Sequence, residues 1–178
     1  MQINSGKFTM TMNSILQYLS TKLLIGLIIA VADVAAAAGS YDLREQQQLV
    51  KTNQVKWNNF LNSTSCGAYT MKFARSCFCL PDWRGPYQVV VNSTGGVASA
   101  VYMYGSDQYA GKTVQGAGKA LTVRDVFDEI KRALNQKADG LEVTYDEDRG
   151  YPKEVFIDWE ELATDEEDRY TIENVVPL

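Results

Sequence analysis

Two cysteines separated by one residue are the side chains best suited to chemistry in this chain. Cys77 and Cys79 follow a strand-like alternation of apolar and polar residues, which predicts both thiols on the same face of one strand. On a regular strand their Cα atoms would lie about 6.6 Å apart, at the outer limit for a disulfide. A bond between them therefore requires a bend, and Pro81 with the later Gly85-Pro86 pair offers a place for the strand to break.

A third cysteine, Cys66, leaves the pairing open. Three thiols cannot all pair within one chain, so one is expected to stay free or to bridge to another molecule. One structural disulfide among the three, buried unpaired thiols, a redox-active Cys77–Cys79 pair and a metal site are the alternatives. Redox activity would need an electropositive setting that lowers a thiol pKa, and Arg75 and Arg84 are the nearby groups that could supply it.

The chain contains no histidine, which excludes several catalytic classes. Ser-His-Asp and Cys-His catalysis require an imidazole, as do His-ligated zinc sites. Asp158 and Glu160 would share one strand face, but paired surface acids are more often solvated than catalytic. Residues 146–150 favour a turn over a calcium loop. We predict no catalytic residue, no metal site and no cofactor, with the redox pair as the one enzymatic alternative.

The N-terminal segment has the composition of a secretory signal peptide. Lys7 and Lys22 precede the apolar run 23–32, and small residues with an Ala-x-Ala-like site follow. We predict a signal peptide over residues 1–38 and a secreted or extracytoplasmic mature protein. The alternative is a membrane anchor through an uncleaved segment, although Asp33 ends the run well short of the about 20 apolar residues that span a bilayer.

The remaining residues, 39–178, suffice for a single domain with its own core and are too few for two. The net charge of −5 argues against a nucleic-acid partner, because such a partner requires a basic face. Membrane contact is expected only if the signal segment is retained. Acidic residues crowd the last quarter of the chain, and we interpret them as a solvated face. An unknown protein or small molecule is the expected partner.

Hydrophobic periodicity predicts an α+β fold. A seven-residue apolar spacing through Leu43, Val50 and Trp57 indicates an N-terminal helix with a narrow seam. Thr122 is predicted to cap a second helix, and Gly105 to Ala120 to form a mobile loop. One strand is predicted from residue 69 into the cysteines, and others at 87–91, 97–104, 141–145, 155–159 and 170–176. This order predicts an antiparallel sheet of about six strands, with the second helix inserted after the third strand and helices on one face.

Six short motifs together carry a family resemblance. They comprise residues 75–79, 84–86, 123–128, 143–146, 150–152 and 157–158. In this order and spacing the chain resembles the uncharacterised family catalogued as domain of unknown function 6174, from roughly Trp57 to Leu178. The resemblance implies a small exported or lipid-anchored protein without an established activity, so no catalytic role carries over. This chain adds Cys66 and lacks a lipobox cysteine after its signal.

These patterns predict an exported domain with a binding or structural role, and the alternative is a thiol-disulfide redox protein. The segments first expected to meet a partner are the Gly105 to Ala120 loop and residues 81–86. The candidate binding surface consists of Arg75, Trp83, Arg84 and Tyr151. Asn62 and Asn92 begin N-glycosylation sequons in predicted loops or turns, which matter if the source is eukaryotic.

Overall fold

A computed structural model describes residues 43–103, 109–116, 118–160 and 166–178. Within it, Glu45–Leu178 forms a compact unit. The predicted signal peptide lies outside the described residues, as does part of the predicted Gly105 to Ala120 loop. No helix in the part of the chain that the structure describes has the length and apolarity to span a membrane.

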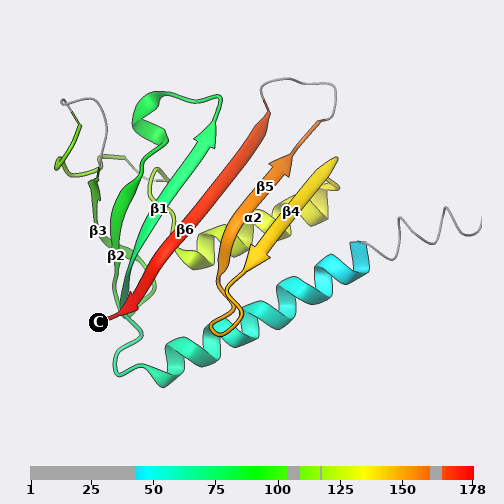
Figure 1. Cartoon of the computed structure of the whole chain (residues 1–178), viewed down its shortest axis with the longest axis horizontal. Coiled ribbons are helices and arrows are strands. Elements are labelled where there is room, and N and C mark those ends of the chain that lie inside the picture. Colours follow the sequence, from blue (N-terminus) through cyan, green and yellow to red (C-terminus); the bar gives the residue numbers. More distant parts are fainter. Residues whose placement is uncertain (1–42, 104–108, 117, 161–165) are drawn as a thin grey trace, which may run out of the picture. The chain divides into compact units, whose positions relative to one another are not determined.

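Six antiparallel strands form one sheet in the order β3-β2-β1-β6-β5-β4 (Figure 1). The strands are β1 (Tyr69–Cys77), β2 (Tyr87–Val91), β3 (Val97–Tyr102), β4 (Gly140–Tyr145), β5 (Pro152–Asp158) and β6 (Glu167–Pro177). Each set of three consecutive strands is a meander, and the meanders join where β1 pairs with β6. In this ladder Phe73 lies opposite Ile172 and Cys77 lies opposite Asp168. The predicted fold class, with its second helix after the third strand, is confirmed.

Both helices cover the same face of the sheet. The N-terminal helix occupies residues 43–63, and α2 spans Val123–Gln136. Tyr69 of β1 touches both of them: its ring lies 5.2 Å from that of Trp57, and its hydroxyl accepts a hydrogen bond of 3.2 Å from the backbone N–H of Val123. The buried side chains of the central strands and of α2 meet beneath these helices. They include Met71, Phe73, Tyr87, Val89, Val126, Phe127, Ile130, Ile157, Tyr170 and Ile172.

A reciprocal capping box begins α2. Thr122 Oγ1 accepts from the Asp125 backbone N–H at 3.2 Å, and Asp125 Oδ2 accepts from the Thr122 backbone N–H at 2.8 Å. Aspartate therefore completes a box in which glutamate or glutamine is usual. The helix ends at Lys137, whose φ of 57° is left-handed.

The turn between β4 and β5 lies directly against the N-terminal helix. Asp146 Oδ1 accepts from the Arg149 backbone N–H at 2.8 Å, as expected for turn chemistry rather than for a metal loop. Gly150 has a φ of +78°, and a Cβ there would lie 2.5 Å from the Asn53 carbonyl oxygen and 2.6 Å from Lys56 Cβ. Glycine is therefore what lets this turn approach the helix so closely.

Two strands extend further than the sequence predicts. β5 begins at Pro152 instead of residue 155. Proline is compatible with this position, because the first residue of a strand tolerates it. β6 begins at Glu167 instead of residue 170. Interpreting the whole acidic run as solvated is wrong for Asp168, which lies in β6 with only 7% of its surface exposed. This carboxylate is buried because an arginine side chain of β1 neutralises it.

Candidate functional site

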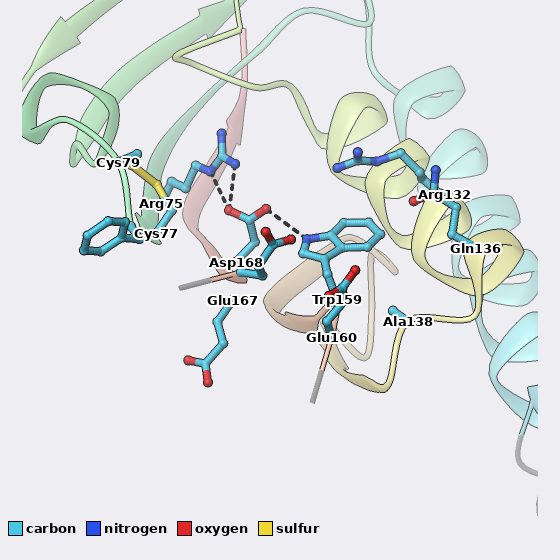
Figure 2. A pocket seen from close by; sticks show the side chains of 12 residues that line it. Arg75, Cys77, Cys79, Arg132, Gln136, Ala138, Trp159, Glu160, Glu167 and Asp168 are labelled. Atoms are coloured by element: carbon cyan, nitrogen blue, oxygen red, sulfur yellow. Dashed lines mark hydrogen bonds and ion pairs between the residues drawn. A yellow bond between two sulfur atoms is a disulfide. The ribbon is translucent and has the colours of Figure 1, made fainter. Parts of the chain in front are cut away.

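A hollow of about 600 Å³ lies where β1 and β6 pass the last turn of α2 (Figure 2). The Cys77–Cys79 disulfide lies on one side of it, and Trp159 with Arg132 of α2 on the other. Asp168 lies between them. The sheet therefore brings residues from the start and the end of the domain to one place.

The disulfide joins Cys77, the last residue of β1, to Cys79. Their Cα atoms are 5.2 Å apart, closer than on a regular strand, so the chain bends at the bond. Cys66 is free and exposed. Its thiol donates to the carbonyl of Leu178 at 3.3 Å, near the opposite end of β1, where the chain enters the strand.

Hydrogen bonds hold the turn that follows the disulfide. This turn contains the short 3-10 helix η1 (Pro81–Trp83), in which the Trp83 N–H donates to the Leu80 carbonyl at 2.9 Å. The Arg75 N–H donates to the Arg84 carbonyl at 2.8 Å, and Arg84 Nη2 donates to the Cys79 carbonyl at 3.0 Å. The turn is thus fastened to β1 at both of its ends.

Asp168 is the central acceptor of the site. Its Oδ1 accepts from Arg75 Nε at 2.9 Å and from Arg75 Nη2 at 2.7 Å, and its Oδ2 accepts from Trp159 Nε1 at 3.3 Å (Figure 2). Burial alone would lower the pKa of Arg75, but the hydrogen bond to Asp168 and the surrounding negative groups raise it overall. The Arg75 guanidinium therefore stays charged beside Asp168.

The second cation of the hollow is also engaged within the protein. The guanidinium of Arg132 lies 4.3 Å from the ring centre of Trp159, and its Nε donates to Glu129 Oε2 at 3.0 Å. By contrast, three exposed carboxylates that line the hollow make no hydrogen bond or ion pair with any described residue. They belong to Glu160, Glu166 and Glu167. The hollow therefore presents uncompensated negative charge.

Two large apolar side chains next to the disulfide are exposed. Phe78 is 78% exposed and Leu80 is 67% exposed, the two highest fractions among the exposed large hydrophobic residues of the described chain. Phe78 lies between the bridged cysteines, whose side chains line the hollow. Phe78 itself also borders the hollow, on the side of the disulfide. Scattered exposed apolar residues are ordinary, but here two of them lie within three residues of each other, one between the bridged cysteines and one directly after them.

A cluster beneath η1 fixes the turn to the sheet. The hydroxyls of Tyr87 and Tyr102 both donate to the Asp82 carbonyl at 2.9 Å. Lys119 forms an ion pair with the Asp82 carboxylate and places its ammonium 5.6 Å from the centre of the Trp83 ring. Lys119 thereby attaches the C-terminal end of the predicted Gly105 to Ala120 loop to the same turn.

Residues 49–177 match a sequence family described as a family of unknown function (DUF6174). The chain belongs to this family. No curated protein and no solved structure matches it. The predicted resemblance to DUF6174 is thus confirmed over most of the domain, and the family description assigns no activity.

In this DUF6174 chain, three of the four residues predicted for the binding surface surround the bridged turn. Arg75 and Arg84 hold its ends, and Trp83 closes η1. Tyr151 does not join them, because it is only 6% exposed and packs against Trp57, with ring centres 6.0 Å apart. Tyr151 directly precedes β5. The hollow lies at the other end of that strand, where Trp159 follows Asp158 and lines it.

The other predicted sites lie apart from the hollow, with one exception. Asn62 and Asn92 are both exposed, and Asn92 Oδ1 accepts from Thr94 Oγ1 at 2.7 Å within its turn. Of the two acids predicted to share a strand face, Glu160 lines the hollow and Asp158 does not. Within the described ranges, no group of three or more acidic or cysteine side chains is arranged to hold a metal ion.

Sequence reasoning missed Phe78, Leu80, Trp159 and Asp168 as parts of this site. The exposure of Phe78 depends on the Cys77–Cys79 pairing, which the sequence left open. No local pattern marks Asp168, whose partner Arg75 is 93 residues away in the sequence.

Proposed function

We propose that this chain is an exported protein-binding module and that its contact surface is the bridged turn, residues 77–84, with the adjacent hollow. The observation that carries the proposal is the exposure of Phe78 on a turn closed by a disulfide. Export is supported by the signal-like segment at residues 1–38 and by the disulfide itself, since such bonds persist mainly in oxidising compartments.

The energetics favour association through this turn. Burying an exposed Phe or Leu side chain in a partner contributes about 1.5 to 3 kcal/mol each. Aromatic anchors of this kind carry a large share of the binding energy in many interfaces. Because the disulfide and the bonds to Arg75 and Arg84 already restrict the turn, little conformational entropy is lost when it docks.

Charge around the turn defines the class of partner. Arg75 and Arg132 are neutralised by carboxylates of this chain, whereas Glu160 and its neighbours in the hollow are not. A partner should therefore offer an apolar pocket bordered by lysine or arginine. Such complementarity accelerates encounter and makes the association rate fall as salt increases.

A thiol-disulfide activity is the second candidate, because the bond borders an open hollow. In that reaction the bridge would take two electrons and two protons from two substrate thiols, whose sulfurs become joined. The setting argues against it, since Arg75, the cation beside Cys77, is committed to Asp168. Under this alternative, Cys77→Ser and Cys79→Ser would each abolish thiol oxidation of a reduced model dithiol while the fold survives. Equal rates with and without the protein would remove this candidate.

Site-specific cross-linking tests the binding proposal. A benzophenone amino acid at position 78 should capture a secreted or surface protein of the source cells, whereas the same group at position 176 should not. Val176 is a matched control, because it is 54% exposed and pairs with Thr70, far along β1 from the bridge. With the captured protein purified, Phe78→Ala should weaken the dissociation constant at least tenfold and Val176→Ala should leave it unchanged. Equal capture at both positions, or unchanged affinity in Phe78→Ala, would refute the proposal.

A further inference from the structure

We infer that the Cys77–Cys79 bond is a redox switch for this surface, which a dithiol reductant turns off by releasing Phe78. The inference rests on the proposed function, because the state that it switches is the ordered presentation of Phe78 to a partner. It concerns the regulation of the turn and assigns no catalytic turnover to the cysteines.

The bond is the principal restraint on Phe78. Cys77 is anchored in the β1–β6 ladder opposite Asp168, and the Leu80 carbonyl is anchored by the Trp83 N–H. Between these anchors Phe78 makes no backbone hydrogen bond to any described residue, and its side chain is mostly exposed. Opening the bond therefore leaves Phe78 with no restraint of its own, between Cys77 in the ladder and the Cys79 carbonyl, which accepts from Arg84 Nη2.

The bond is also accessible. Both sulfur-bearing residues are only partly buried, and both line the open hollow. A reductant can thus reach the bond while the domain stays folded, because the core next to it has its own support. Phe73, four residues before Cys77, is fully buried and paired with Ile172 of β6.

The chemical step is an ordinary thiol-disulfide exchange. One thiolate of the dithiol attacks one sulfur of the bridge, forming a mixed disulfide and releasing the other cysteine as a thiolate, which takes up a proton. The second thiol of the reductant, once deprotonated, then displaces the remaining cysteine. The protein gains two electrons and two protons, and the reductant leaves as a cyclic disulfide. Phe78 then lies on an open segment between two free thiols.

Backbone ¹⁵N relaxation of the full-length protein measures the switch directly. Cys66→Ser serves as the background, because it removes the free thiol and leaves the bridge as the one group that dithiothreitol changes. In the oxidised protein the order parameter of the Phe78 amide should be near the rigid value of about 0.85, and after reduction it should fall below about 0.6. The Phe73 amide should keep its value. The triple variant, which also carries Cys77→Ser and Cys79→Ser, should show the low Phe78 value with and without reductant.

The outcomes separate the switch from the binding proposal. An unchanged Phe78 order parameter after intact mass shows the bridge reduced would overturn the switch, and so would a simultaneous loss of order at Phe73. With the partner captured at position 78, reduction should weaken binding by the same factor as Phe78→Ala, and that variant should no longer respond to reductant. Phe78→Ala binding like the unaltered protein would instead remove the proposed function, while the relaxation measurement would still decide whether the bond controls the order of Phe78.

Discussion

Replacing Gly150 with alanine should separate the β4–β5 turn from the N-terminal helix. Holding an L-residue at the φ of +78° costs about 1 to 2 kcal/mol. The new Cβ would also lie 2.5 Å from the Asn53 carbonyl oxygen and 2.6 Å from Lys56 Cβ, so the turn or the helix must move, which adds about 1 to 3 kcal/mol. Gly150→Ala should therefore lower the free energy of unfolding by about 2 to 5 kcal/mol.

Gly111→Ala is the matched control for this change. Gly111 has a φ of +74°, almost that of Gly150, but a Cβ there would meet no atom within 4 Å. The control should lose the backbone cost alone, about 1 to 2 kcal/mol. Urea denaturation followed by tryptophan fluorescence suits the comparison, because Trp57 is buried in the helix that the turn contacts. Equal losses in the two variants would show that the close approach at Gly150 is not a constraint, and the reasoning would fail.

Three further predictions concern the bridge, the buried ion pair and the tyrosines. The loop closed by Cys77 and Cys79 spans three residues, for which the chain-entropy relation gives a stabilisation of about 1.6 kcal/mol. Urea denaturation of Cys77→Ser/Cys79→Ser should therefore show a free energy of unfolding lower by that order, with the domain still folded. Asp168→Asn leaves the Arg75 guanidinium, whose side chain is 21% exposed, without its counter-charge, and should lower the free energy of unfolding by about 2 to 3 kcal/mol in thermal unfolding. Arg75→Met combined with Asp168→Leu should recover much of this loss, and no recovery would contradict the explanation. Burial raises the pKa of Tyr69 to about 12 and also raises the pKa values of Tyr87, Tyr145 and Tyr170, so folding favours their neutral forms. The stability they contribute is complete below the unfolded pKa of about 10 and is lost as the pH rises from there through 12, which tyrosinate absorbance should report as ionisation coincident with unfolding; independent ionisation near pH 10 of all tyrosines would contradict it.

The parts of the fold with a local cause were predictable from the sequence. Tyr69, Met71 and Phe73 alternate with polar residues because one face of β1 is covered by helices, so a period of two marks the strand. Thr122 and Asp125 mark the start of α2 because their bonds join residues three apart. Such signals depend on neighbours in the chain and need no knowledge of the sheet order.

The candidate site was less predictable because its contacts join distant residues. Asp168 lies in an acidic run that is otherwise exposed, and its burial follows from the pairing of β6 with β1, which no local pattern specifies. The place of Trp159 in the site was equally unpredictable, because the residues that it contacts come from α2 and β6. The exposure of Phe78 depends on which cysteines pair, and the sequence alone left that choice open.

The central position of β6 governs when the chain is able to fold. Without Glu167–Pro177, the order β3-β2-β1-β6-β5-β4 separates into β3-β2-β1 and β5-β4, and the number of unpaired strand edges rises from two to four. Exposed edges of this kind recruit other chains into aggregates. The pairing of β1 with β6 also closes a loop of about a hundred residues, an event that slows folding. A nascent chain of this protein therefore stays vulnerable until β6 is free to insert, and loss of β6 should produce aggregation instead of a smaller soluble domain.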